Sequence, residues 1–285
     1  MNYQFAQDIK VVIELLGLSH SDFARELKIS RSTLNNWLSE SHEPDDRNVK
    51  AFYEFTYSKG VQLNRIKEQL YTEETSASNG LLLFHGSKTG IEGMPDLKHA
   101  KNQNDFGPGF YCGDTMEQAI TFVAAYPNAS LYMVKFNPEG LQRCEFHVDQ
   151  DWMLTVAYYR NLLESYNDSK IVRKLAERVE NSDYVIAPIA DNRMFEIIDQ
   201  FIDGELTDVQ CQHCLSATNL GTQYVFRTQE AMRQVQLLEH CFLSDTEKHR
   251  YMQLKQDNYA VNRDKVKVAR KQYRNQGKYI EEILQ

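Results

Sequence analysis

The residues with the clearest chemical potential lie where an apolar run ends, in LLLFHGS at 81–87. The run has the length and composition of a buried strand, yet it ends in His85, Gly86 and Ser87 rather than in an ordinary turn. Histidine and serine can hydrogen-bond a ligand, and glycine lets another molecule approach the backbone closely. A histidine at a strand end can equally be a polar residue that the fold itself satisfies, so this stretch alone leaves both interpretations open.

Two further blocks follow along the chain. GPGFY at 107–111 leads into TMEQAITFVAAY at 115–126, which has helical periodicity, and QYVF at 223–226 is a later strand candidate. Each block alone is a weak signal. Three blocks in this order and at these separations are a more specific one.

Together the three blocks resemble the ADP-ribosyltransferase fold, in the branch shared by diphtheria toxin and the poly(ADP-ribose) polymerases. That branch has a strand ending in His-Gly-Ser/Thr, a Gly-x-Gly-aromatic-Tyr strand that leads into a helix, and a late strand opened by a glutamate. The resemblance covers roughly residues 80–240, and the chain is also similar to a bacterial family of unknown function that shares the three blocks. It implies a split β-sheet domain that transfers ADP-ribose from NAD+, which is consumed as a substrate.

The resemblance also implies a slot for nicotinamide. His85 would bond a ribose hydroxyl, the Gly86 backbone would bond the nicotinamide amide, and Ser87 would add a hydroxyl contact. Tyr111 would stack on one face of the ring and Phe122 would close the other, since aromatic stacking adds about 0.5–1.5 kcal/mol beyond area burial. The implied cofactor-binding residues are His85, Gly86, Ser87, Gly109, Tyr111 and Phe122, and the implied catalytic residues are His85, Tyr111 and Gln223.

Gln223 departs from the family pattern, because it stands where the glutamate is expected. An amide can hydrogen-bond a hydroxyl, but it offers no full negative charge and cannot act as a base. Loss of one well-placed electrostatic group costs about 3–4 kcal/mol of barrier. Polymerisation is not expected, because elongation in the polymerase members needs that glutamate, so a single transfer is favoured.

Three outcomes stay open at this position. The acceptor could carry its own charge, another acid could fill in, or the domain could only bind NAD+ or ADP-ribose as a sensor. The candidate acids are Asp183, Asp191, Glu196 and Glu230.

A second resemblance lies at the N-terminus, in LSHSDFARELKISRSTLNNWLSES at 18–41. It is similar to the Xre or phage-repressor type of helix-turn-helix and covers about residues 7–60. In that family the second helix enters the major groove, where asparagine can bond adenine, arginine can bond guanine, and hydroxyls can bond phosphate. The implied DNA-facing residues are Ser30, Arg31, Ser32, Thr33, Asn35 and Asn36.

Charge is uneven along the 285 residues. Residues 1–70 carry 9 basic and 10 acidic side chains, residues 71–245 carry 13 and 25, and residues 246–285 carry 10 and 5. A near-neutral helix-turn-helix has a weak salt-dependent affinity for DNA, so docking of its helices on the second domain or on a partner protein is the alternative. Only the tail has the charge to attract a polyanion, and a solvated helix face explains it equally well.

The remaining composition predicts a soluble, cytoplasmic protein without metal. No apolar run reaches the length of a membrane span, and five cysteines in a chain of this size do not suggest a disulfide framework. Cys211 and Cys214 form a single CxxC without a second pair, which favours a helix whose cysteines pack inward over a zinc site.

The sequence therefore predicts an α+β protein in four parts. They are a helix-turn-helix domain at 1–70, a linker at 71–80, an ADP-ribosyltransferase-like domain at 81–245 and a basic helical tail at 246–285, with helix throughout after the strand near 223. The expected function is mono-ADP-ribosylation of a protein or nucleic-acid acceptor, by a bacterial toxin or defence effector with an inhibitory partner. The rival is a non-enzymatic DNA-binding regulator whose second domain senses NAD+ or ADP-ribose, and a third alternative is an adaptor in which both folds have decayed.

Overall fold

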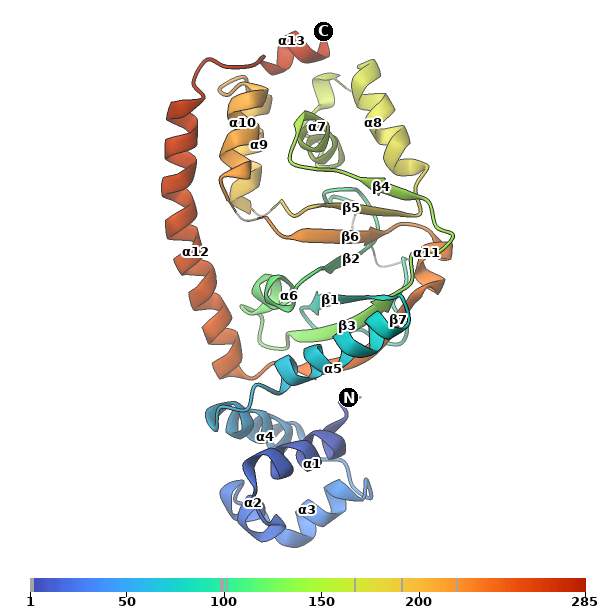
Figure 1. The fold of residues 1–285 in the computed structure, drawn as a ribbon, viewed down its shortest axis with the longest axis vertical. Helices are drawn as coiled ribbons and strands as arrows, with labels where there is room; N and C mark the ends of the chain where they lie inside the picture. Colours follow the sequence, from blue (N-terminus) through green and yellow to red (C-terminus); the bar gives the residue numbers. More distant parts are fainter. Residues whose placement is uncertain (1–2, 98–99, 101, 167, 191, 219) are drawn as a thin grey trace. The chain divides into compact units, whose positions relative to one another are not determined.

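The computed structural model describes residues 3–97, 100, 102–166, 168–190, 192–218 and 220–285, and its fold is mixed α+β, as predicted (Figure 1). Five helices come first, and strands interleaved with helices follow. The elements, in chain order, are α1 (Phe5–Leu16), α2 (His20–Glu26), α3 (Arg31–Leu38), α4 (Asp46–Ser58), α5 (Leu63–Ala77), β1 (Leu81–Ser87), β2 (Phe110–Gly113), α6 (Met116–Val123), β3 (Ser130–Phe136), β4 (Arg143–Glu145), α7 (Gln150–Tyr159), η1 (Glu164–Tyr166), α8 (Lys170–Glu180), β5 (Tyr184–Pro188), α9 (Asn192–Ile202), α10 (Asp208–Ser216), β6 (Thr222–Phe226), α11 (Gln229–Arg233), β7 (Val235–Phe242), α12 (Asp245–Gln272) and α13 (Ile280–Leu284).

The strands form a seven-stranded sheet in the order β4-β5-β6-β2-β1-β3-β7. β5 pairs with β6, and β6 with β2, in the antiparallel sense, whereas β4 and β5 run parallel. The chain divides into two compact units that each combine separate segments. Unit 1 comprises Met1–Gly90, Ala119–Lys135 and Leu237–Gln253, and unit 2 comprises Ile91–Gln118, Phe136–Gln236 and Leu254–Gln285.

The N-terminal helices of unit 1 form the predicted helix-turn-helix. Ser19 caps the start of α2, because its hydroxyl accepts a hydrogen bond from the Asp22 N–H at 3.1 Å. The turn before α3 passes through Lys28 in the left-handed region, with φ +56°. Phe23, Leu34 and Phe52 are fully buried in the core that these helices share.

The same helices also dock on strand β7 of unit 1. Lys67 of α5 lies 2.7 Å from an Asp8 carboxylate oxygen on α1 and 2.9 Å from a Glu239 oxygen on β7, and all three side chains are buried. Burial acts to lower the pKa of the Lys67 ammonium, but the nearby carboxylates raise it by more, so the group stays charged. The Tyr53 ring stacks on Phe242 at a centroid distance of 4.7 Å. The N-terminal helices therefore pack on strand β7, which lies in the second half of the chain. Such docking was the alternative to DNA contact.

Two expectations about secondary structure were wrong. Residues 71–77 continue helix α5 rather than forming an irregular linker. Val235–Phe242 is strand β7, although the sequence after β6 reads as helix to the end. The run QVQLLEHCF contains few turn-forming residues and no strict alternation, so its periodicity does not separate a helix from a strand that is buried unevenly. The strands predicted near 81, 110 and 223 are confirmed as β1, β2 and β6.

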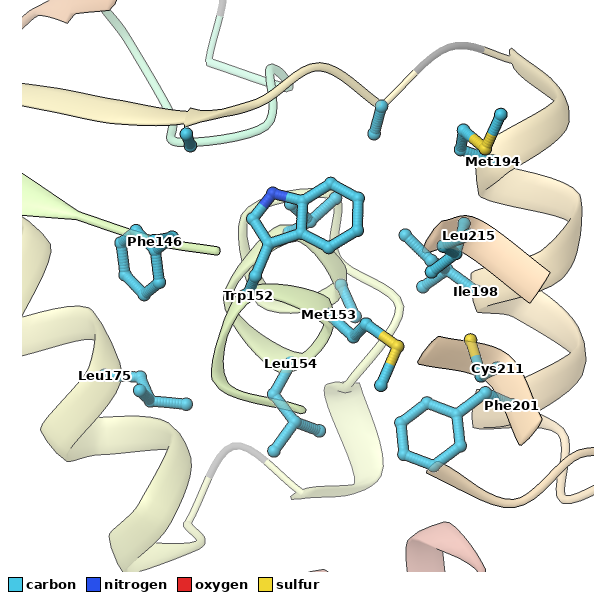
Figure 2. Packing of buried hydrophobic residues seen from close by; sticks show 14 of the residues in the cluster. Phe146, Trp152, Met153, Leu154, Leu175, Met194, Ile198, Phe201, Cys211 and Leu215 are labelled. Atoms are coloured by element: carbon cyan, nitrogen blue, oxygen red, sulfur yellow. The ribbon is translucent and has the colours of Figure 1, made fainter. Parts of the chain in front are cut away.

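The core of unit 2 fills the space between the helices on one face of β5 and β6. Figure 2 shows Trp152 of α7 between Phe146 on one side and Ile198 and Leu215 on the other. Cys211 and Cys214 of α10 are fully buried in this cluster as thiols, as the inward-packing interpretation predicted. Among the described residues, no group of histidine, cysteine and acidic side chains could hold a metal ion.

The tail of unit 2 packs on helix α10. The Gln210 amide donates to the Arg270 carbonyl at 2.6 Å, Asp208 Oδ1 accepts from the Lys278 N–H at 2.7 Å, and the His213 and Tyr273 rings stack. The tail therefore covers part of unit 2. Within the described part of the chain, no helix has both the length and the apolar character of a membrane span.

The buried Lys67 ion cluster yields a stability prediction. Lys67→Met leaves Asp8 and Glu239 buried without their cation, so the free energy of unfolding should fall by about 3–5 kcal/mol in denaturant titrations. The control is Lys59→Met, which removes an exposed ion pair to Glu26 in the same unit and should cost less than about 1 kcal/mol. Equal losses in the two variants would contradict a structural role for the cluster.

Candidate functional site

The carboxamide of Gln223 is held from two sides at the start of β6. Its side chain is buried, and Nε2 donates to Asp105 Oδ2 at 2.8 Å and to the Pro188 carbonyl at 3.0 Å. An amide nitrogen has two hydrogens, so both are used. The oxygen Oε1 is the atom that Gln223 can offer to a ligand.

Asp105 is the acid that the structure places beside Gln223. It is 5% exposed, and its Oδ1 accepts from Arg160 Nε at 3.2 Å and Nη2 at 2.7 Å. The Arg160 guanidinium in turn lies 4.1 Å from the centre of the Phe195 ring. The pair is close to neutral as a whole, so Asp105 orients its neighbours rather than acting as a free base.

Tyr111 shares a face of the sheet with Gln223. In the β2–β6 register Tyr111 lies opposite Val225 and Gly113 lies opposite Gln223, so the two side chains are diagonal neighbours on adjacent strands. The Tyr111 hydroxyl donates to the Gly107 carbonyl at 2.7 Å and accepts from the Phe106 N–H at 3.2 Å. Burial raises the pKa of this phenol well above its usual range, so it acts as a neutral anchor that holds the ring.

Packing within unit 2 explains why the two glycines of GPGFY carry no side chain. Gly107 adopts φ +73°, and a Cβ there would lie 3.0 Å from the Tyr159 ring. A Cβ on Gly109 would lie 2.7 Å from Val225 Cγ1 and 2.9 Å from the Phe226 carbonyl. Either contact would require a neighbour to move, so Gly109 allows β2 to approach β6 and Gly107 allows its loop to approach Tyr159 of α7, whether or not a ligand binds.

The His-Gly-Ser residues lie in unit 1 and are similarly engaged. A Cβ on Gly86 would lie 2.3 Å from the Ala119 carbonyl of α6, so glycine allows the strand to approach this helix. The Ser87 hydroxyl donates to the Gly90 carbonyl at 2.9 Å. Phe122, on the same helix, is 55% exposed and is therefore not a core aromatic.

His85 belongs to a column of rings in unit 1. Its ring centre lies 6.3 Å from that of Tyr132, which stacks on His240 at 4.5 Å, and His240 lies 4.2 Å from Tyr3. Burial lowers the pKa of His240 to about 4, so this ring is neutral at neutral pH. The column joins the end of β1 to the N-terminal segment of the helix-turn-helix.

The other candidate acids have structural partners or open surroundings. Asp183 accepts hydrogen bonds from the Gln142 N–H at 2.8 Å and the Thr228 hydroxyl at 2.7 Å. Glu230 pairs with Arg233 on the surface, and Glu196 is exposed. Asp191 lies outside the described residues.

A pocket of about 340 Å³ opens in unit 2 beside the start of β6. It includes Pro188, whose carbonyl takes the Gln223 amide, and Thr222, which precedes Gln223. Its wall combines apolar side chains with hydroxyl groups and so could accept a partly polar molecule. The lining residues are Glu145, Phe146, His147, Val148, Ile186, Ala187, Pro188, Ser216, Thr218, Leu220, Gly221 and Thr222.

Helix α3 leaves most of the predicted DNA-facing side chains accessible. Arg31, Ser32 and Asn35 are exposed, Asn36 is half-buried, and Leu34 and Trp37 anchor the opposite face in the core. Ser30 and Thr33 have a local task. The Ser30 hydroxyl accepts from the Thr33 N–H at 2.9 Å as the helix cap, and the two hydroxyls lie 2.8 Å apart.

Two family models match the chain. One, described as a protein of unknown function (DUF3990), matches residues 81–237, which is more than half of the chain. The chain belongs to the DUF3990 family. The other model, described as helix-turn-helix, matches residues 9–53. Comparisons with curated proteins and with solved structures found no match.

The helix-turn-helix match confirms the N-terminal domain and suggests a DNA-binding regulator. The description of the DUF3990 family assigns no activity, so NAD+ binding and ADP-ribose transfer stay predictions. Sequence reasoning did not find Asp105 or Arg160, which lie in a loop and near a helix end far apart along the chain. The only available signal was the position of Asp105 two residues before the GPGFY block.

Gln223→Glu tests whether the amide is required at this position. A carboxylate would face the oxygens of Asp105 and Pro188, so the free energy of unfolding should fall by about 1–3 kcal/mol. Burial and Asp105 would raise the pKa of the new carboxyl above its unfolded value of about 4.3. The folded state then binds a proton that the unfolded state has lost, so the loss should be larger at about pH 8 than at about pH 5.5.

The measurement is urea unfolding of the wild type and Gln223→Glu at both pH values. Adding Asp105→Asn to Gln223→Glu removes one of the opposing charges and should recover part of the lost stability at the higher pH. An unchanged midpoint in Gln223→Glu would show that the amide contacts are dispensable.

Substitutions on α3 test DNA contact. Arg31→Ala and Asn35→Ala should each weaken binding to a duplex selected by the wild type from a random library, by about 1–3 kcal/mol if the side chain reads a base. The matched control is Arg25→Ala on α2, an exposed arginine already paired with Asp22. Equal losses for Arg25→Ala and Arg31→Ala in a fluorescence-anisotropy titration would indicate a general charge effect instead of recognition by α3.

Proposed function

We propose that the DUF3990 domain binds NAD+ and transfers a single ADP-ribose to a macromolecular acceptor, in a chain that binds DNA through α3. The observation that carries the proposal is the pairing of Tyr111 with Gln223. They occupy one face of adjacent strands, and both are hydrogen-bonded to residues 105–107. The ADP-ribosyltransferase resemblance predicts an aromatic ring and a hydroxyl-binding group from these two blocks.

The reaction breaks the bond between ribose C1′ and the nicotinamide nitrogen. Nicotinamide leaves with the bonding electrons, positive charge builds on the ribose, and a nucleophilic oxygen or nitrogen of the acceptor forms the new bond to C1′ and loses its proton. Tyr111 is suited to stack on the nicotinamide ring, and Gln223 Oε1 is suited to accept a hydrogen bond from a ribose hydroxyl.

Catalysis here would depend on positioning more than on charge. The amide of Gln223 is neutral, and Arg160 balances the carboxylate of Asp105. Holding the reactants in a reactive geometry can supply a large part of a barrier reduction without a charged group. A slow transferase that makes a single addition fits these residues better than a polymerase does.

A second candidate function is favoured by the same neutral amide. A domain that binds NAD+ or ADP-ribose without cleavage needs the ring and hydroxyl contacts but no group that stabilises a cation. In unit 1 the Lys67 cluster and the ring column join the helix-turn-helix to β7 and to His85. A DNA-binding regulator that senses the nucleotide would use such a connection.

Incubation of the purified chain with NAD+ labelled in the ADP-ribose part, together with host lysate fractionated into protein, DNA and RNA, tests the proposal. Label should appear in one fraction, with release of nicotinamide, and both should be lost in His85→Ala. His42→Ala, which removes an exposed histidine in the helix-turn-helix segment, should leave labelling unchanged. Binding of NAD+ without label transfer or nicotinamide release would overturn the transferase and favour the sensor.

A further inference from the structure

We propose that Asp105 fixes the orientation of the Gln223 amide, so that the DUF3990 domain presents an acceptor oxygen and selects a ligand group that donates a hydrogen bond. This inference rests on the proposed NAD+ site and deepens it. The group selected is a hydroxyl of the nicotinamide ribose. Asp105 is a positioning residue, because it acts on the ligand through Gln223.

The orientation follows from the surroundings of the amide. Asp105 Oδ2 and the Pro188 carbonyl lie 2.8 Å and 3.0 Å from Nε2, and both are oxygens that can only accept. Turning the amide by half a rotation would place Oε1 against these two oxygens and lose both hydrogen bonds. The side chain is 6% exposed, so water has little access to compensate.

Arg160 holds the Asp105 carboxyl group in the position that fixes the Gln223 amide. Two guanidinium nitrogens contact Oδ1, which leaves Oδ2 for Gln223, and the guanidinium plane is supported by Phe195. A carboxyl group held in this way has both of its oxygens engaged as hydrogen-bond acceptors, one with Arg160 and one with Gln223. A chain of contacts from Phe195 through Arg160 and Asp105 therefore fixes the orientation of the Gln223 amide.

The chemistry of the selected group follows from the amide oxygen Oε1, because Nε2 is already bonded to Asp105 and Pro188. Oε1 accepts and cannot donate, so a hydroxyl is favoured at this point and a phosphate or carboxylate oxygen is not. Tyr111, diagonal to Gln223 on the neighbouring strand, offers a ring on the same face. A ribose hydroxyl next to a flat aromatic base has both features.

The test compares NAD+ with two analogues in which the 2′- or the 3′-hydroxyl of the nicotinamide ribose is replaced by fluorine, which cannot donate. By calorimetry, the wild type should bind one analogue about tenfold more weakly than NAD+, as expected for one lost hydrogen bond. In Asp105→Asn, the new amide can present either its oxygen or its nitrogen to Gln223 and so no longer fixes the Gln223 amide. The ratio of the affinity for NAD+ to the affinity for that analogue should therefore fall to about threefold or less. Glu177→Gln, which removes an exposed carboxylate of unit 2, should keep the wild-type ratio of the two affinities.

Gln223→Met is the second variant of this test and can be used if Asp105→Asn does not fold. It removes the amide, keeps the length of the side chain and leaves the Asp105–Arg160 pair in place, and its affinities for NAD+ and for that analogue should become equal. Wild-type discrimination retained in Asp105→Asn or in Gln223→Met would overturn the inference while NAD+ binding stands. No binding of NAD+ to the wild type would overturn the proposed function and the ligand class together.

Discussion

The ion pair between Asp105 and Arg160 determines the geometry of the candidate site. It fixes Asp105, the first residue of the segment 105–107. At the other end of this segment, the Tyr111 hydroxyl donates to the Gly107 carbonyl and the Arg227 guanidinium donates to the Phe106 carbonyl. Gln223 joins the same segment through Asp105. Strands β2 and β6 therefore meet at a loop whose backbone has little freedom, and the two side chains most suited to ligand contact are attached to it.

A second ionic cluster has the corresponding role in unit 1. Lys67 lies between carboxylates of α1 and β7, and Tyr53 and Tyr71 donate hydrogen bonds to the same two acids. Buried charges of this kind add little net stability compared with apolar packing, but they tolerate only one arrangement of the elements that carry them. The helix-turn-helix is therefore fixed on its sheet strand in a specific way, while the exposed side chains of α3 remain available.

The sequence predicted the elements better than it predicted their grouping. The resemblance at 18–41 gave the helix-turn-helix, and the three motif blocks gave strands β1, β2 and β6, because these signals are local. Strand β7 was missed because its side chains are buried unevenly. The two compact units each combine segments that are distant along the chain, and local patterns do not mark such a grouping. The three motif blocks were found, whereas Asp105 and Arg160 were not, since a pair separated by 55 residues leaves no local pattern.

The glutamine at position 223 and the aspartate at position 105 are best understood as one arrangement. A glutamate at position 223 and a carboxylate 2.8 Å away could not both remain ionised without a further cation, and Arg160 already faces the other oxygen of Asp105. An amide removes this conflict, because it donates to the carboxylate and still offers an acceptor oxygen. The glutamine that departs from the ADP-ribosyltransferase pattern is therefore accommodated by its surroundings, in which the negative charge lies on Asp105, one side chain away. In the proposed transferase, Gln223 would hold a ribose hydroxyl in place, and the charge that the reaction requires would come from the acceptor or from the leaving group.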